Sequence, residues 1–351
     1  MSRSRAQAAE AADTPEAAPL EIENPAPAKP LDDSDGVPAP KAAPKPLPKL
    51  PPRPLPKIPP PPKSVDWYEA LQSGDDEAFK KDVRKNLERI IAKHSALAAY
   101  EVMFLFDDDS IGTFHSDRLY SAAAAFRGKG KDFLLIVDSP GGRIEPAYLI
   151  SKSLKRIAKK TFSVAIPRRA KSAATLLALG ADQIHMGMIS QLGPIDPQVR
   201  GLPVLALGNA LDHIADTACK FPGASEMLTK YLTDQAPIQV LGYYERVGES
   251  AAQYAERLLT GKKLPAGTDA GKIGRHLVHH YKDHSFVIDT EEALQLLGSD
   301  FIKEQTPEYD LADELYVFLE MVQILTSIRG KKFWVVGGLD GIVITKKPDD
   351  K

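Results

Sequence analysis

The residue of this sequence best suited to chemistry is a serine at the start of an apolar stretch. Ser172 follows the basic segment Arg168–Lys171 and precedes an unbroken apolar run that ends at Gly180. Backbone N–H groups in the first turn of a helix lack an intrahelical partner and favour negative charge. Ser172 can therefore be a nucleophile whose oxyanion lies near the Ala173 N–H. It can equally be an ordinary N-cap, the role that serines before helices usually have.

A pair of glycines favours the catalytic interpretation. Gly141 and Gly142 follow the apolar run Phe133–Val137 and an Asp-Ser-Pro turn. Without a Cβ they can adopt conformations that expose N–H groups at the carboxyl end of a strand, where open α/β sheets bind ligands. The N–H of Gly141 or Gly142 would then form an oxyanion hole together with the Ala173 N–H, and the next unit of the chain supplies the serine.

Strands and helices are expected to alternate around these residues. Short apolar runs predict buried strands, and apolar residues at helical spacing predict helices. The expected strands are Glu101–Phe106, Phe133–Val137, Thr161–Ile166 and Gln183–Met186; the expected helices are Trp67–Lys93, Ser116–Phe126, Glu145–Lys160 and Lys171–Leu179. The short connections between them favour an α/β fold with a parallel sheet covered by helices.

The N-terminal part differs in composition from the rest. Of the 29 prolines, eighteen precede Lys63, and the first aromatic residue is Trp67. Such a segment buries too little apolar surface to offset the entropy of ordering. We expect residues 1–64 to be a disordered proline-rich segment and residues 65–351 to form the folded domain. The tract 44–62 predicts a polyproline II helix, either a spacer or a ligand for an aromatic-lined groove of a partner.

Composition also limits the partners and the compartment. The formal net charge of −2 argues against a nucleic-acid binder. The single cysteine, Cys219, cannot form an intrachain disulfide and is expected to be a small buried apolar residue. There is no apolar run long enough to span a membrane and no secretory h-region, which favours the cytoplasm.

Three segments resemble one protein family. They are Asp138–Gly142 (DSPGG), Ala170–Asp182 (AKSAATLLALGAD) and Ser190–Gln198 (SQLGPIDPQ). Together they look like the serine dehydrogenase proteinase family, a relative of the Clp protease proteolytic subunit and of signal peptide peptidase A. A later segment, Tyr281–Ile288, is similar to the histidine-containing motif of this family, so the resemblance covers about residues 100–300.

The resemblance implies a fold and a site. The fold is the ClpP/crotonase-like spiral of β-β-α units with a helical C-terminal portion. Ser172 would be the nucleophile, His284 the base and Asp196 the residue that orients the base, with the oxyanion hole at Gly141, Gly142 and Ala173. No cofactor or metal is expected. The resemblance also implies a peptide or protein substrate and a homo-oligomer.

The base and the bound groups have alternatives. His276, His280 and His284 would share one helix face and could bind zinc, although Ser285–Asp289 has the pattern of a strand. A lysine, either Lys171, Lys220 or Lys230, could serve as the base of a Ser–Lys dyad. The acidic triplet at residues 107–109 is either a solvated turn or a cation site.

Three functions are consistent with these residues. The leading one is a serine peptidase that forms an acyl-enzyme on Ser172. The second is a non-catalytic assembly or docking protein of the same fold that engages a partner through its proline-rich segment. The third is acyl-CoA chemistry, which crotonases perform with an oxyanion hole but without a nucleophilic serine.

Overall fold

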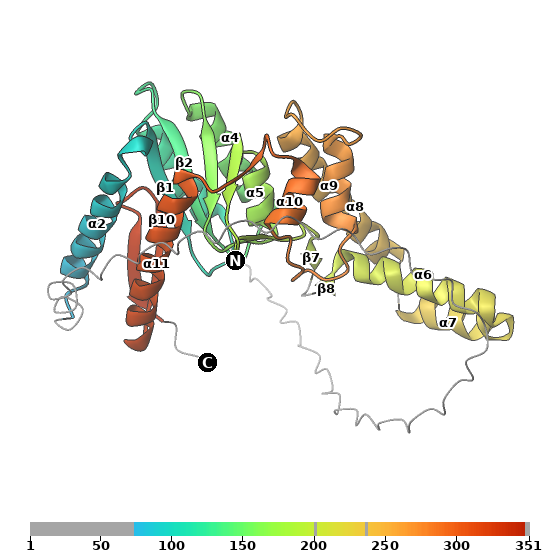
Figure 1. Cartoon of the computed structure of the whole chain (residues 1–351). Helices are drawn as coiled ribbons and strands as arrows, with labels where there is room; N and C mark the ends of the chain where they lie inside the picture. Colours follow the sequence, from blue (N-terminus) through green and yellow to red (C-terminus); the bar gives the residue numbers. More distant parts are fainter. Residues whose placement is uncertain (1–73, 200–201, 236–237, 348–351) are drawn as a thin grey trace, which may run out of the picture. The chain divides into compact units, whose positions relative to one another are not determined.

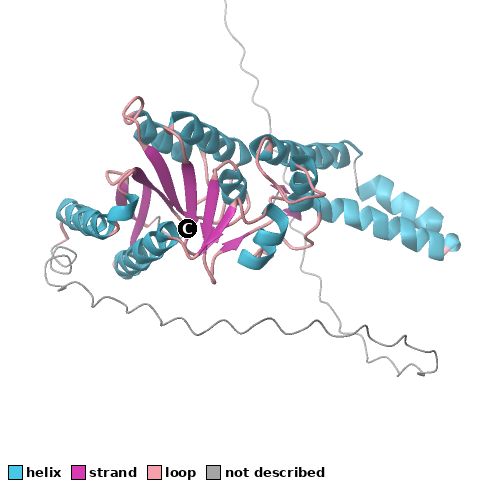
Figure 2. Cartoon of the chain, turned by 45° about the horizontal axis from the view of Figure 1, so that its top comes forward, coloured by secondary structure: helices cyan, strands magenta, loops and turns pink. Residues whose placement is uncertain are grey.

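The core of the chain is a seven-stranded sheet. The computed structural model describes residues 74–199, 202–235 and 238–347, so the predicted proline-rich segment 1–64 lies outside the described residues. The strand order is β11-β10-β1-β2-β3-β5-β9 (Figures 1 and 2). The strands span β1 (Tyr100–Phe106), β2 (Asp132–Asp138), β3 (Phe162–Ile166), β5 (Gln183–Met186), β9 (Ile302–Glu304), β10 (Lys331–Gly337) and β11 (Ile342–Lys346).

The strands from β1 to β9 in this sheet are parallel, as predicted. β1, β2, β3, β5 and β9 run in one direction, whereas β10 pairs antiparallel with β1 and β11 pairs antiparallel with β10. The four strands predicted around Ser172, from Glu101 to Met186, are all present within about a residue of their expected ends. The return of the chain to the sheet after residue 330 was not predicted from the sequence.

Short extended segments form a second ladder beside the main sheet. Isolated bridges join Ile111 to Gly142 and Ser139 to Ala170, and β4 (Arg169–Ala170) pairs with β6 (Gln191–Leu192). Each unit therefore has a long strand, a short extended segment and then a helix: α3 (Thr113–Ala124), α4 (Ile144–Ile157) or α5 (Ala173–Leu179). This arrangement confirms the predicted spiral of β-β-α units.

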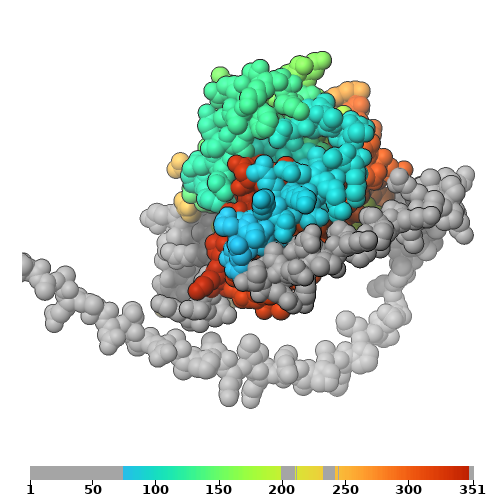
Figure 3. All heavy atoms as spheres, turned by 90° about the vertical axis from the view of Figure 1, so that its left-hand side faces the viewer, coloured from blue at the N-terminus to red at the C-terminus, as the bar shows by residue number. Residues whose placement is uncertain are grey.

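Both faces of the sheet are covered, because successive side chains of a strand point to opposite faces. In β1, Met103 and Leu105 belong to the core cluster with α3, α4 and α5, while Phe104 and Phe106 belong to the cluster with α2 (Asp76–Lys93) and α11 (Pro307–Ile328). Figure 3 shows α2 against the C-terminal segments that are coloured red. The helix predicted over Trp67–Lys93 corresponds to α2, which begins at Asp76; residues 67–73 lie outside the described residues.

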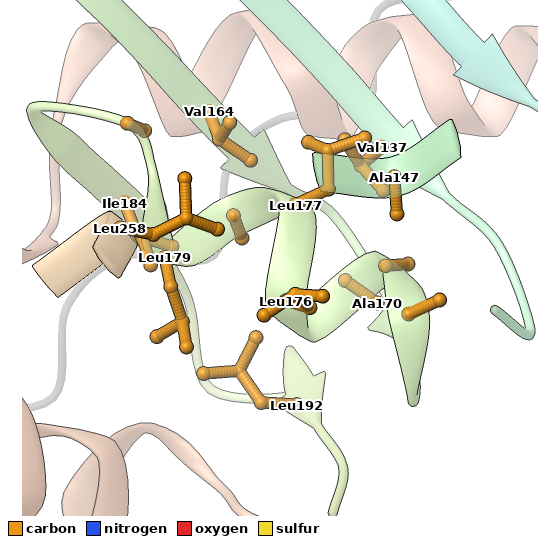
Figure 4. Packing of buried hydrophobic residues seen from close by; sticks show 14 of the residues in the cluster. Val137, Ala147, Val164, Ala170, Leu176, Leu177, Leu179, Ile184, Leu192 and Leu258 are labelled. Atoms are coloured by element: carbon orange, nitrogen blue, oxygen red, sulfur yellow. The ribbon is translucent and has the colours of Figure 1, made fainter. Parts of the chain in front are cut away.

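The helix that follows Ser172 is buried on every side. All seven residues of α5 are buried. Leu177 lies beside Val137 of β2, and Leu176 lies on the side of α5 that faces Leu192 (Figure 4). Burial of each such leucine contributes about 1.5–3 kcal/mol. The start of α5 is therefore fixed by the core.

The region after residue 200 is mainly helical, as predicted. It contains α6 (Val204–Lys220), α7 (Ser225–Gln235), α8 (Ile238–Leu259), α9 (Ala270–His279) and α10 (Thr290–Leu297) before α11. β7 (Gln198–Val199) and β8 (Leu202–Pro203) form a short ladder before α6. Within the described ranges no helix is long and apolar enough to cross a bilayer.

Two smaller predictions were wrong. Cys219 is exposed on α6 rather than buried, because it lies outside the apolar face of that helix. Ser285–Asp289 is a loop with a single bridge at Ile288 instead of a strand. The apolar residues Phe286 and Val287 are exposed there, so the pattern of this short stretch did not report burial.

Candidate active site

Ser172 occupies the N-cap position of α5 without acting as a cap. Its side chain makes no capping hydrogen bond, and its backbone has φ 51° and ψ −119°. A residue with a Cβ in this region costs about 1–3 kcal/mol, so the surrounding structure must impose it. Gln305 is the other non-glycine residue with positive φ in the described part of the chain. The ordinary N-cap interpretation therefore does not describe Ser172.

Backbone and side-chain hydrogen bonds hold the segment around Ser172. The Lys171 N–H donates to the Ser139 carbonyl (3.1 Å), and the Lys171 carbonyl accepts from the Ala174 N–H (2.9 Å). Thr175, which is fully buried, donates its hydroxyl to the Ala170 carbonyl (2.6 Å). These contacts fix the chain on both sides of the serine, which explains how its strained conformation persists.

Gly141 and Gly142 each pack closely against the backbone of a neighbouring segment. Gly141 has φ +103°, and a Cβ added there would lie 2.5 Å from the Lys171 carbonyl oxygen and 2.8 Å from the Ser172 Cβ. A Cβ on Gly142 (φ +148°) would lie 2.2 Å from the backbone nitrogen of Ile111. No L side chain fits at either position without movement of the backbone. Gly141 therefore brings the second unit of the spiral into contact with the serine, and Gly142 brings it into contact with Ile111 of the first unit.

Two of the three N–H groups expected in the oxyanion hole have no hydrogen-bond acceptor among the described residues. The Gly141 N–H donates to the Ser139 hydroxyl (3.2 Å). Over the residues that the structure describes, neither the Gly142 N–H nor the Ala173 N–H has an acceptor within the protein. Free N–H groups near a nucleophile are the donors that can stabilise a developing oxyanion. The geometry thus favours Gly142 and Ala173 over Gly141.

The residues expected to provide the base lie together. The Nδ1 of His284 is 2.7 Å from Oδ1 of Asp196, and Asp196 is buried while the His284 side chain is 30% exposed. An ionised carboxylate only accepts hydrogen bonds, so His284 carries a proton on Nδ1. In the neutral ring this leaves the Nε2 lone pair free, as a general base requires.

The loop that carries His284 is joined to the serine segment. Ile288 exchanges two backbone hydrogen bonds with Leu192 (2.9 and 3.2 Å), and Leu192 pairs through β6 with Ala170 of β4. The acid segment is fixed as well, because the Ile195 N–H donates to the Leu277 carbonyl (3.0 Å). The second ladder therefore connects Ala170 with Ile288, which are 118 positions apart in the chain.

The lysine alternatives are placed elsewhere or are already engaged. The Nζ of Lys171 donates to the carbonyls of Leu192 (3.1 Å) and Phe286 (2.9 Å). Burial lowers the pKa of its ammonium from the ordinary value. Lys220 and Lys230 are exposed, at the end of α6 and in α7 respectively.

The histidines do not converge on a common point. The rings of His276 and His280 stack with their centroids 4.1 Å apart, His279 lies 3.6 Å from Glu249, and His284 pairs with Asp196. Stacked rings present their faces to each other rather than their nitrogens to one ion. No group of three or more potential metal ligands occurs in the described ranges.

The acidic triplet at residues 107–109 is also dispersed. Asp107 is buried and lies 3.1 Å from Nε2 of His115, so it is not a solvated turn residue. Asp108 pairs with Arg169 and with Gln323, and Asp109 pairs with Lys332. Each carboxylate thus has a different partner, and the triplet does not form a cation cage.

Two residues that position the site were not identified from the sequence. Thr175 accepts a hydrogen bond from the Gly193 N–H (3.0 Å) in addition to its bond to Ala170. Gly193 leaves room for Lys171, whose Cδ would lie 2.7 Å from an added Cβ. A threonine within an otherwise apolar helix is a signal that could have identified the first, since a buried hydroxyl needs partners.

These features define a class of protein. An α/β fold with a strained serine, free backbone N–H groups beside it and a hydrogen-bonded His–Asp pair has the set of groups from which serine hydrolases build their sites. Residues 114–219 match the family model described as ClpP-like SDH-type serine proteinase.

Similar proteins are known from sequence and structure. The chain is 29% identical over 208 residues to the uncharacterized protein MJ0137 of Methanocaldococcus jannaschii, covering 58% of this chain and 62% of that protein. It is 38% identical over 73 residues to MJ1495 of the same organism, covering 21% and 25% of the respective chains. The chain therefore spans less than two thirds of the length of either relative.

Two solved structures show a distant likeness. The membrane-bound stomatin-specific protease 1510-N, in a mutant form, matches at 14% identity and a TM-score of 0.39, covering 68% of this chain and 92% of that one. ClpP1 from Listeria monocytogenes matches at 12% identity and a TM-score of 0.35, covering 62% and 99%. Likenesses of this size carry no inference about the site.

Proposed function

We propose that this protein is a serine peptidase that hydrolyses peptide bonds through an acyl-enzyme on Ser172. The observation that carries the proposal is the conformation of Ser172, which is strained, uncapped and packed against Gly141. Backbone strain at a non-glycine residue is concentrated at functional sites, and a serine at a sharp strand-to-helix turn presents its hydroxyl to a substrate. The match of residues 114–219 to the ClpP-like SDH-type serine proteinase model supports the same reaction class.

The first half of the reaction forms the acyl-enzyme. His284 Nε2 takes the Ser172 hydroxyl proton as Oγ attacks the scissile carbonyl carbon. The carbonyl π electrons move to oxygen, and the N–H groups of Gly142 and Ala173 donate to this oxyanion. The intermediate collapses when the C–N bond breaks and His284 returns the proton to the leaving amine. Asp196 stabilises the imidazolium that exists between these steps.

The second half releases the enzyme. Water enters after the amine has left, and His284 removes its proton while the hydroxide adds to the ester carbonyl. The same two N–H groups donate hydrogen bonds to the second oxyanion. Collapse breaks the bond to Ser172 Oγ, which recovers the proton from His284, and the acid product leaves. No external oxidant, reductant or cofactor is required for this balance.

Labelling with a fluorophosphonate tests the nucleophile. We expect the wild-type protein and Ser121→Ala, a change on the exposed side of α3, to react with the probe and to hydrolyse labelled casein. Ser172→Ala should lose both reactions because no other hydroxyl occupies the strained position. Equal labelling of Ser172→Ala and wild type would reject the proposal. Retained turnover without labelling would instead favour oxyanion-hole chemistry without a nucleophilic serine.

A further inference from the structure

Lys171, the residue before Ser172, contacts two separate loops of the site. Lys171 Nζ donates to two backbone carbonyls that come from different loops, those of Leu192 and Phe286. Phe286 lies two residues after His284, and Leu192 lies four residues before Asp196. One ammonium group thus contacts both segments from which the base and its acidic partner come. No carboxylate in the described residues is paired with it.

The aliphatic part of the Lys171 side chain packs against one particular residue, Gly193. The stem crosses Gly193, where an added Cβ would lie 2.7 Å from Cδ and 3.5 Å from Cα of Lys171. The Gly193 N–H in turn donates to the Thr175 hydroxyl (3.0 Å). The segments on either side of Ser172 are therefore locked to the Gly-Pro-Ile-Asp segment from both sides, by Lys171 before the serine and by Thr175 after it.

The loop of His284 connects α9 and α10 and is anchored in the core at both ends, because Tyr281 and Ile288 are buried. Between these anchors the loop is exposed, with Phe286 44% exposed and Val287 50% exposed. Its long-range bonds are the pair between Ile288 and Leu192, the His284–Asp196 contact and the Lys171 contact to Phe286. The hydrogen bond of an ammonium to a carbonyl in a partly desolvated position is stronger than a neutral one.

We propose that Lys171 is a positioning residue that fastens the loop Asp283–Ile288 to the serine segment and so holds His284 in register with Ser172. The role in catalysis rests on the proposed peptidase function, whereas the attachment of the loop does not. Lys171 acts through the loop and not on the substrate, because both of its hydrogen bonds are to the chain itself. A displacement of the base by about 1 Å can lower the rate about 100-fold.

Lys171→Met is the most direct test, because methionine keeps an apolar stem and removes the ammonium. We expect amide hydrogen exchange of a peptide spanning 281–289 to become faster, and kcat on labelled casein to fall about 10- to 100-fold with little change in KM. Lys171→Arg, which keeps charged donors, should restore part of kcat. Lys152→Met, an exposed change on α4, is the matched control and should alter neither measurement.

Each outcome decides a separate claim. Unchanged exchange at 281–289 in Lys171→Met overturns the attachment. Faster exchange with unchanged kcat overturns the positioning role. Faster exchange in a protein whose wild type neither labels nor cleaves supports the attachment and rejects the peptidase function. If Lys171→Met does not fold, Gly193→Ala decides, since its Cβ displaces the lysine stem and should speed exchange in the same peptide.

Discussion

The serine side of the site and the histidine side differ in how the chain holds them. Gly141, Gly142 and Ser172 lie in consecutive units of the spiral, beside parallel strands and at the start of a fully buried helix. His284 lies on the exposed part of a loop, between the buried residues Tyr281 and Ile288, and this part is held by one carboxylate and one lysine. Extensive core packing fixes the serine side, whereas a small number of hydrogen bonds fixes the histidine side.

This difference has a physical basis and a consequence. Strain at Ser172 of about 1–3 kcal/mol requires a rigid surrounding, which a core of buried α5 provides. A proton-transferring group needs position but stores no such strain, so a loop with several specific hydrogen bonds suffices. We therefore expect changes on the serine side to reduce stability and activity together, and changes on the histidine side to reduce activity alone.

The largest effect is expected from removal of the proposed base. His284→Ala should lower kcat about 10⁴-fold or more, and Asp196→Asn should approach the same loss because the neutral amide favours the wrong tautomer. The midpoint of thermal unfolding of His284→Ala should change little, since its side chain lies on an exposed loop. His279→Ala on α9 is the control and should retain activity. Full activity of His284→Ala would move the base to another residue.

A smaller loss of activity, together with a loss of stability, is expected on the serine side. In Gly141→Ala the new Cβ overlaps the Lys171 carbonyl and the Ser172 Cβ, so kcat should fall about 100-fold and the free energy of unfolding by about 1–3 kcal/mol. Gly128→Ala isolates the backbone cost, because Gly128 also has positive φ (+77°) but no atom within 4 Å of the added Cβ. Kinetics and urea unfolding of both variants give the comparison. Equal activity of the two variants would contradict the close packing of Gly141.

The smallest effect concerns the sheet alone. Burial lowers the pKa of His185 in β5 from 6.5 to about 4, and its Nε2 has no partner in the described structure. The unfolded state therefore binds a proton at a higher pH than the folded state, and stability is lost as the pH falls from about 6.5 toward 4. Between pH 7 and pH 5 the loss from this residue is about 2 kcal/mol.

Urea unfolding of wild type and His185→Asn at these two pH values checks this effect. Asparagine can keep a hydrogen bond to the Thr306 hydroxyl, which lies 2.9 Å from Nδ1 of His185, but it does not titrate. The difference between pH 7 and pH 5 should shrink by about 2 kcal/mol in the variant. An unchanged difference would assign the acid sensitivity to groups outside the sheet.

Much of the fold could be predicted because its signals are local. β1, β2, β3 and β5 are short apolar runs buried on both faces, and the helices that follow the first three are apolar where they face the sheet, so local pattern and tertiary burial agree. β10 and β11 were not predicted, because β10 pairs with β1, more than 200 residues earlier in the chain, and β11 joins the sheet only through β10. Ser285–Asp289 was mistaken for a strand because five residues are too few to separate a strand from an apolar loop.

The sequence by itself determined the serine, the two glycines and the order of the strand–turn–helix units that carry them. Those residues lie in turns directly beside strands, where the effect of a missing Cβ or of a helix start can be inferred from neighbouring residues alone. Tertiary structure alone decided that Ser172 is strained and uncapped, which N–H groups remain free, and that Lys171 binds the loop of His284. Those properties depend on contacts between segments distant in the chain, and residue types along a sequence do not specify which distant carbonyl a given side chain will meet.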